Sequence, residues 1–331
     1  MSERTPGQET GQAAFSWREY VDAIVVERGS LALAALHLAE RRGFEEDVAS
    51  VERGLRRLRE RGSKDGGVWG ERVLRCFGLP AAVGDRVRWM GQYHTRFTDL
   101  PASLCEELLR PWDRPPVSES PARIWVLLGR AGLALRRRRD HDVQALLEQA
   151  TLLAKSAEPA AQIELALVTA YARSRPDPEL ARAPLDRART LLETRRSDLR
   201  EDDYACLFAR WIDHVAYPLN KPRSGAADHR GALALYQQIP EDGPLFARCR
   251  RENGLGWSHL LLGDRPRAQA HARASVEAAG DSGSLRMRAM ALNLLAAASE
   301  GEAAERARAR ARAIARRLED EALLVRFGAG E

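Results

Sequence analysis

The sequence predicts an all-α protein in which an N-terminal helical domain precedes a solenoid of helical hairpins. Apolar residues recur at spacings of three and four along most of the chain, which is the period of an amphipathic helix. Alanine, leucine, arginine and glutamate, all good helix formers, dominate the chain beyond residue 121. No stretch shows the sustained two-residue alternation of a half-buried strand.

The composition is that of a folded chain and excludes a membrane span. The chain has 331 residues, of which 44% are hydrophobic, and this length suits about two domains. The longest uncharged runs, 30–39 and 289–299, are shorter than the roughly 18 apolar residues that a span needs. The start of the chain has no apolar stretch typical of a secretory signal. The cysteines at 76, 105, 206 and 249 are widely scattered, which predicts reduced thiols in the cytoplasm.

The N-terminal part is expected to be a polar, disordered tail at residues 1–12 followed by a helical domain at 13–110. Apolar spacing, with Ser30 as a cap, predicts helices at 15–27, 30–40, 45–61, 70–77 and 85–93. An aromatic group that includes Trp69, Trp89, Tyr93 and Phe97 is expected to pack where this domain meets the hairpins.

The run from Gly29 to Leu58 is similar to a helix-turn-helix, a DNA-binding motif. The resemblance implies that Val51, Leu55 and Leu58 face the core of the motif. It implies that another set of side chains faces a major groove, namely Ser50, Arg53, Arg56 and Arg57. Acidic residues at 45–47, and equal numbers of basic and acidic residues over 1–110, weigh against DNA binding.

A proline-rich linker is predicted at residues 111–121. Four prolines in this segment forbid a continuous helix and favour extended backbone. After it, residues 122–331 form the hairpin domain. Short breakers divide it into five pairs of helices, at 121–139 and 141–156, 160–174 and 179–195, 199–217 and 227–239, 245–262 and 265–279, and 284–299 and 302–318.

The fourth pair has Leu255-Gly256 in its first helix, Gly263-Asp264 between its helices and small residues at 268–275, and with this pattern it resembles a tetratricopeptide repeat. Leu255-Gly256 would let two helices approach closely, Gly263-Asp264 would form the turn, and the small residues of 268–275 would pack against the first helix. Ala232, Ala268 and Ala304 follow at intervals of 36, near the family's period of about 34 residues. The resemblance covers residues 120–318, although Arg136–Arg139 and a proline-rich insertion at 218–225 depart from the pattern.

The sequence predicts no catalytic residue, metal site or cofactor. None of the three lysines lies in a phosphate-binding loop, and the run from Gly256 to Leu260 lacks the last glycine of a serine-nucleophile elbow. Three aspartate-histidine sequences recur, at 140–142, 213–214 and 228–229. Neighbouring residues of a helix point in different directions, so helix capping explains the first and third better than metal binding does.

Surface recognition is therefore the function that the sequence favours. The first helix of each hairpin would line the concave face of the solenoid, with candidate peptide-binding residues Arg250, Asn253, Trp257, Arg286 and Asn293. That these side chains only pack or are solvated stays an open alternative. We expect a non-enzymatic adaptor that binds a protein or peptide. The alternative is a transcriptional regulator that binds DNA through its helix-turn-helix and senses a ligand with its repeats; the oligomeric state is left open.

Overall fold

The computed structural model describes residues 15–41, 46–222 and 225–328, and these residues confirm the all-α prediction. They contain helices throughout and no β-strand. The tail at 1–12 and Glu45, the expected first residue of the third helix, lie outside the described residues. The chain divides into two compact units, one of residues 1–87 and 107–123 and the other of residues 88–106 and 124–331. The division falls within α5 (Ala81–Gly91), within α6 (Ala102–Leu109) and after Arg123, the first residue of α7 (Arg123–Arg136).

The first unit is a small helical domain built on one apolar core. Its helices are α1 (Trp17–Arg28), α2 (Leu31–Ala39), α3 (Val48–Arg59) and α4 (Gly67–Phe77), with short 3-10 helices η2 (Arg110–Trp112) and η3 (Val117–Glu119). The buried side chains of Trp17, Tyr20 and Leu38 meet those of Leu55 and Val73. Trp17 Nε1 donates a hydrogen bond to the Lys64 carbonyl at 2.9 Å, and this bond satisfies the one polar atom of that buried ring.

The proline-rich segment at 111–121 is more tightly wound than the extended linker that was predicted. It contains η3, and Val117 within it is buried. The Glu119 carboxylate accepts a hydrogen bond from the Gly66 amide at 3.0 Å. Proline excludes the interior of an α-helix, but its fixed φ near −65° also suits a 3-10 turn. The segment therefore packs within the first unit.

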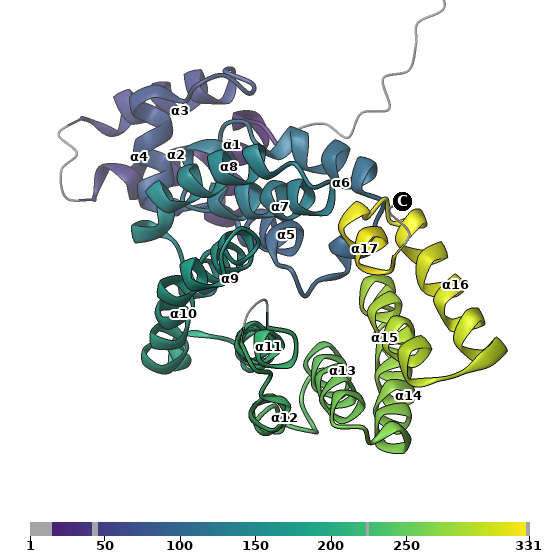
Figure 1. The fold of residues 1–331 in the computed structure, drawn as a ribbon. Helices are drawn as coiled ribbons and strands as arrows, with labels where there is room; N and C mark the ends of the chain where they lie inside the picture. Colours follow the sequence, from purple (N-terminus) through teal and green to yellow (C-terminus); the bar gives the residue numbers. More distant parts are fainter. Residues whose placement is uncertain (1–14, 42–45, 223–224, 329–331) are drawn as a thin grey trace, which may run out of the picture. The chain divides into compact units, whose positions relative to one another are not determined.

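The second unit consists mainly of helices that pack in consecutive pairs (Figure 1). The helices are α7 (Arg123–Arg136), α8 (Asp140–Leu153), α9 (Pro159–Ser174), α10 (Arg182–Thr194), α11 (Glu201–Asn220), α12 (His229–Tyr236), α13 (Leu245–Leu261), α14 (Arg265–Asp281), α15 (Leu285–Ala298), α16 (Gly301–Arg317) and α17 (Glu321–Arg326). The unit also contains the 3-10 helices η1 (Arg96–Asp99), η4 (Ala154–Ser156), η5 (Pro178–Ala181) and η6 (Arg196–Asp198). The five expected pairs correspond to α7 through α16, and α17 was not predicted.

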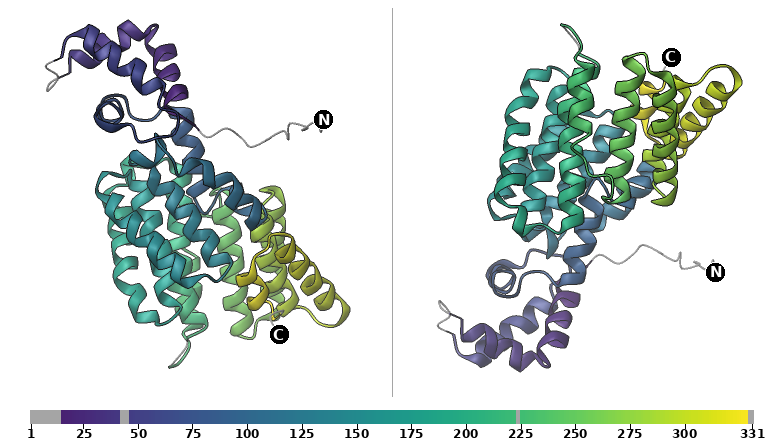
Figure 2. Two further views of the ribbon diagram at one scale, coloured as in Figure 1. Left: turned by 90° about the horizontal axis from the view of Figure 1, so that it is seen from above. Right: turned by 90° about the horizontal axis from the view of Figure 1, so that it is seen from below.

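The first helices of successive pairs also pack on one another. α9 contacts α11, α11 contacts α13, and α13 contacts α15. α9, α11 and α13 are seen nearly end-on in Figure 1, and the helices of this unit run alongside one another in Figure 2. Along this arc α10, α12, α14 and α16 lie on the outside. One face of α9, α11, α13 and α15 is therefore turned inward, and we call it the inner face.

Local sequence signals set several of the helix ends in the second unit. The side chains of Asp264 and Asp320 accept hydrogen bonds from backbone amides in the first turns of α14 and α17, which otherwise lack partners. Gly263, at the turn between α13 and α14, has a φ of 86°, a conformation that side chains rarely adopt. α11 continues through Pro218 to Asn220, whereas the proline was expected to end it. Pro218, in the last turn, removes one backbone hydrogen bond, and the helix still closes with the Lys221 amide donating to the Tyr217 carbonyl at 3.0 Å.

Candidate functional site

A stretch of the second unit at residues 92–99, which runs without helix to Thr95 and then forms η1, lies against the inner face, and we call it the Tyr93 segment. Asp203, in the first turn of α11, holds one end of it. The Asp203 carboxylate accepts a hydrogen bond from Gln92 Nε2 at 3.0 Å and lies 3.2 Å from His94 Nε2. It also pairs with Arg88 at 2.6 Å and with Arg200 at 2.7 Å. Burial raises the pKa of Asp203, but these hydrogen bonds and charges outweigh it and hold the pKa well below its usual range.

The Tyr93 side chain lies among three arginines from three successive first helices. The guanidinium carbons of Arg210 on α11, Arg286 on α15 and Arg250 on α13 are 4.4, 4.9 and 5.5 Å from the centre of its ring. The Tyr93 hydroxyl accepts hydrogen bonds from Arg250 Nη2 at 3.0 Å and from Arg286 Nη1. Guanidinium groups are attracted to the electron-rich faces of aromatic rings, so these contacts fix the Tyr93 segment to the helices.

Each of these arginines also has a carboxylate partner. Arg210 Nη1 lies 2.5 Å from an oxygen of Glu164 on α9. Arg250 pairs with Asp213 on α11, and Arg286 Nε lies 2.9 Å from Asp320 at the start of α17. The pairs compensate the positive charge, which buried arginines require.

The arginines change the acidity of the groups that they surround. Burial raises the pKa of Tyr93, but the positive charges of Arg286, Arg250 and Arg210 outweigh burial, and the net pKa lies below its ordinary value. The pKa of His214, which follows Asp213 in α11, is lowered, whereas a histidine paired with a carboxylate has its pKa raised. Burial and the charge of Arg210 lower the pKa of His214 to about 4, so its imidazole is neutral at pH 7.

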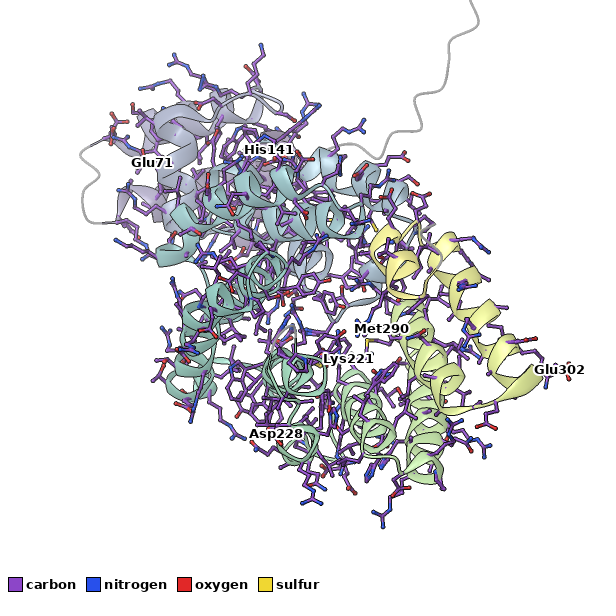
Figure 3. All side chains as sticks on the ribbon, viewed as in Figure 1. Glu71, His141, Lys221, Asp228, Met290 and Glu302 are labelled. Atoms are coloured by element: carbon purple, nitrogen blue, oxygen red, sulfur yellow. The ribbon has the colours of Figure 1, made fainter. Side chains whose placement is uncertain are left out.

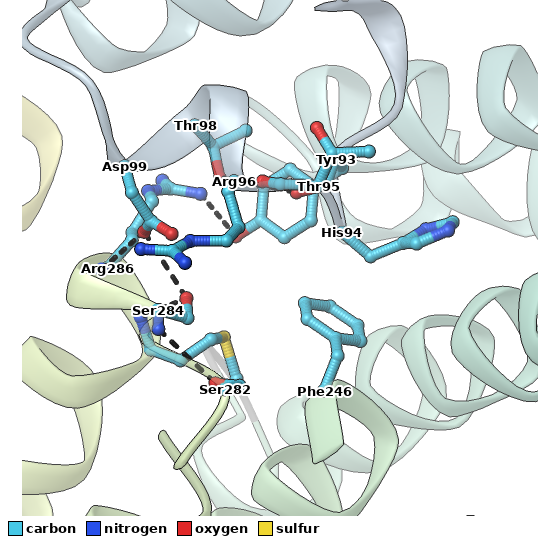
Figure 4. A pocket seen from close by; sticks show the side chains of 11 residues that line it. Tyr93, His94, Thr95, Arg96, Thr98, Asp99, Phe246, Ser282, Ser284 and Arg286 are labelled. Atoms are coloured by element: carbon cyan, nitrogen blue, oxygen red, sulfur yellow. Dashed lines mark hydrogen bonds between the residues drawn. The ribbon is translucent and has the colours of Figure 1, made fainter. Parts of the chain in front are cut away.

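A small pocket opens between the Tyr93 segment, Phe246 on α13 and the start of α15 (Figure 4). Asp99 Oδ1 accepts a hydrogen bond from the Arg286 amide at 2.9 Å and lies 3.3 Å from the Ser284 hydroxyl. Burial raises the pKa of Asp99 against the effect of these bonds. The polar groups that line the pocket are largely used to attach the Tyr93 segment to α15.

The predicted peptide-binding residues divide into two groups. Arg250 and Arg286 come together at Tyr93, and Asn253 is buried beside them on α13, 8% exposed. Trp257 and Asn293 are half-buried. Arg250 and Arg286 are therefore engaged by the chain itself, whereas the buried Asn253 Nδ2 has no hydrogen-bond partner among the described residues. The second group lies further along the helices.

Arg250 and Arg286 of the first group, and Trp257 and Asn293 of the second, belong to two layers of the inner face. The first layer is Arg210, Arg250 and Arg286, and the second is Tyr217, Trp257 and Asn293, each seven positions later on the same helix. Seven residues are close to two full turns, so both layers share one face and lie about 10 Å apart along the helices. The Tyr93 ring occupies the first layer.

Two cations lie at the second layer. Lys221 Nζ is 3.9 Å from the centre of the Trp257 ring, and the Arg326 guanidinium carbon is 5.0 Å from that of Tyr217. In Figure 3, Lys221 and Met290 lie toward the middle of the arc of helices, whereas Glu302 lies on the outside. Both cations are exposed. The second layer thus combines two aromatic rings, an amide and two positive charges that reach solvent.

The candidate DNA-binding residues lie on α3 in the first unit. Val51, Leu55 and Leu58 are buried, as the helix-turn-helix resemblance implies. Ser50 is half-buried, and the three arginines of the set, Arg53, Arg56 and Arg57, are exposed. Arg56 pairs with Glu52 at 2.5 Å. The connection from Glu40 to Asp47 is longer than the three or four residues usual for this motif.

The aspartate-histidine sequences serve the fold in three different ways. Asp228 caps α12, as expected. Asp140 lies inside the first turn of α8 and pairs with Arg175 at 2.5 Å, so the expectation that it caps the helix is wrong. Asp213 pairs with Arg250. Within the described ranges, no three histidine, cysteine, aspartate or glutamate side chains gather as a metal site would require.

Sequence reasoning missed Arg210, Tyr217, Lys221 and Arg326. Arg210 and Arg250 are 40 positions apart, whereas Arg250 and Arg286 are 36 apart. The proline-rich insertion between α11 and α12 interrupts the 36-residue interval on which the alignment rested. An alignment that allows a shift of four residues would have found the row that contains Arg210 and Tyr217.

Comparisons of the chain with protein-family models, curated proteins and solved structures found no match in any of the three. Among the residues that the structure describes, no helix is both long and apolar enough to cross a membrane.

Proposed function

We propose that the protein is a non-enzymatic adaptor that binds a peptide segment of a partner protein along the inner face. The observation that carries this proposal is the row of Tyr217, Trp257 and Asn293, which repeats one position in three successive helices. Such a row suits a ligand that crosses the helices, and an extended peptide is such a ligand. With about 10 Å between neighbouring helices and about 3.3 Å per extended residue, roughly six residues would cross the row.

The Tyr93 segment supports the proposal because Tyr93, in the part of the segment without helix, is held against these helices. Side chains from three successive first helices contact the one tyrosine ring. The second layer offers the same kinds of group for recognition. An aromatic ring is a rigid anchor, and an amide can pair with a peptide backbone.

The resemblance of residues 255–275 to a tetratricopeptide repeat also supports the proposal. A Cβ atom added at Gly256 would lie 2.6 Å from Leu294 Cδ2, and this close approach fits the role of the glycine in that family. We propose that the helical pairs are tetratricopeptide-like and form a solenoid. The proposal puts the protein in the cytoplasm, since all four cysteines are free and three of them are buried.

The test is capture of partners from the source cell, followed by binding measurements with a synthetic segment of the captured protein. Trp257→Ala should weaken binding about 30-fold or more, the effect of losing an interface hot spot. Trp211→Ala is the matched control, because Trp211 is also half-buried on α11 but donates its Nε1 hydrogen to Leu185 of the neighbouring hairpin. Melting curves of both variants check the fold. If the Trp257→Ala protein is folded and its affinity is unchanged, the inner face is not the binding site.

A DNA-binding regulator is the second candidate. It is favoured by Arg53 and Arg57, which are exposed one turn apart on α3 and have no ion pair among the described residues. Asp47 weighs against it, because its carboxylate caps the end of α3 that would enter the groove.

The regulator is tested with promoter fragments from the source genome. Arg53→Ala combined with Arg57→Ala should abolish specific binding, while Arg308→Ala with Arg310→Ala on α16 should not. Exposed arginines contribute little to stability, so both variants should fold. If the unaltered protein has no salt-dependent affinity for DNA, this candidate is removed.

A further inference from the structure

The positive charges of the second layer differ from those of the first in how they are compensated. Arg210, Arg250 and Arg286 each have a carboxylate partner from a neighbouring element. Lys221 and Arg326 have no ion pair within the part of the chain that the structure describes. These two cations therefore differ from the first-layer arginines in being free to pair with an anion from outside the chain.

These two cations lie around one aromatic surface. Arg326, on α17, is stacked on Tyr217, and Lys221, one turn beyond Tyr217 at the end of α11, is stacked on Trp257. Tyr217 is 37% exposed, so the surface between the cations reaches solvent.

The electrostatics agree with this geometry. Burial against the Trp257 ring lowers the pKa of Lys221, even though the side chain reaches solvent, and the positive charge of Arg326 lowers it further. The two cations therefore repel each other, and a negative charge between them would relieve that repulsion.

An acidic group that the charge of Arg326 reaches, Asp213, is already engaged. Burial raises the pKa of Asp213, but nearby positive charges outweigh it and the net pKa is lowered. Arg250 has the stronger effect, and Arg326 contributes a smaller one. The Asp213 carboxylate accepts hydrogen bonds from Arg250 and from the Tyr236 hydroxyl, the latter at 2.9 Å. It is therefore directed toward α13 and α12 and does not neutralise the second layer.

We propose that Lys221 and Arg326, with the rings of Tyr217 and Trp257, bind a carboxylate side chain of an acidic partner segment. The inference rests on the proposed adaptor function and names the chemistry of the partner. A carboxylate is the anion that compensates every arginine of the first layer, from Glu164, Asp213 and Asp320. The rings offer flat apolar surface to the methylene groups of a glutamate, and Asn293, in the same row, offers an amide to the peptide backbone.

The experiment measures fluorescence anisotropy with a short labelled peptide of alternating glutamate and alanine, acetylated and amidated at its ends. The same peptide with glutamine in place of glutamate is the ligand control. The test variant is Lys221→Gln with Arg326→Gln. The charge-matched control is Arg308→Gln with Arg310→Gln, which removes two exposed charges from the outer helix α16. All four positions are exposed, and melting curves check that both variants fold.

The glutamate peptide should bind the unaltered protein about tenfold or more tightly than the glutamine peptide, since a hydrogen bond between charged groups is worth at least that factor. Salt should reduce the difference. The test variant should abolish it, and the control variant should keep it. Equal binding of both peptides, or equal loss in both variants, overturns the proposal. Stronger competition by inorganic phosphate or by a short oligonucleotide overturns it too, because the site would then not be one for peptide carboxylates.

The partner segment captured as described above separates this inference from the proposed function. If Trp257→Ala weakens binding of that segment and the Lys221→Gln, Arg326→Gln variant does not, the carboxylate site is wrong and the adaptor function stands. If neither variant weakens it, both proposals fail.

Discussion

Gly254, in the middle of α13, provides a test of how closely the helical pairs are packed. A Cβ atom at this position would lie 2.1 Å from Cδ1 and Cε1 of Tyr236 on α12. Ordinary contact between carbon atoms is about 3.5–4.0 Å, so the ring would have to move by more than about 1 Å. Tyr236 is 2% exposed, and its hydroxyl is bonded to Asp213, so neither end of the side chain is free to shift.

Gly254→Ala should therefore destabilise the protein, although alanine is the better helix former. The gain in helix propensity is about 0.5–1 kcal/mol. The cost of overpacking is about 1–3 kcal/mol, and loss of the Tyr236 hydrogen bond adds about 1 kcal/mol. The expected net loss of unfolding free energy is about 1–3 kcal/mol. Each kcal/mol should lower the melting temperature by about 2–4 °C.

Gly132→Ala is the matched control for this prediction. Gly132 lies inside α7, and a Cβ atom there would meet no atom within 4 Å. The same substitution should therefore raise the unfolding free energy by about 0.5–1 kcal/mol. Urea denaturation followed by circular dichroism measures both variants. If Gly254→Ala stabilises the protein as much as Gly132→Ala does, the close contact of α12 with α13 is refuted.

Three further predictions concern other contacts of the second unit. Gly256→Leu should force the new side chain against Leu294 and lower the unfolding free energy by about 1–3 kcal/mol; an unchanged melting temperature would contradict the contact between α13 and α15. Tyr93→Phe removes the oxygen that Arg250 and Arg286 share and should cost about 1.5–3 kcal/mol in urea denaturation, whereas equal stability would show that this hydroxyl does not hold the segment. Asp203→Asn should destabilise the protein at neutral pH, because the folded-state pKa of this carboxylate lies below its unfolded-state value near 4. The difference from the unaltered protein should shrink as the pH falls from about 4 toward 2, and a constant difference over that interval would be inconsistent with the ion pairs.

The sequence by itself determined most of the α-helices and the pairing of those in the second unit. The spacing of apolar residues located α7 through α16, and the aspartates and glycines of the turns marked many of their ends. These signals act within a few residues of the position that they control, so a single chain displays them. Periodicity also identified the buried face of α3, because one side of that helix is apolar.

Only the tertiary structure decided what lies on the inner face. The sequence placed Tyr93 in a group of aromatic residues and did not indicate its contact with the arginines. Its hydroxyl accepts a hydrogen bond from Arg286, which lies 193 positions later in the chain. α17 was not predicted, and its Arg326 stacks on Tyr217, more than 100 positions earlier. Contacts between such distant residues leave no local pattern, because they depend on how the intervening helices curve. Periodicity predicted the helix positions of Arg250 and Arg286. Their contacts with Tyr93, and the positions of Lys221 and Arg326, depend on segments that the repeat pattern does not include.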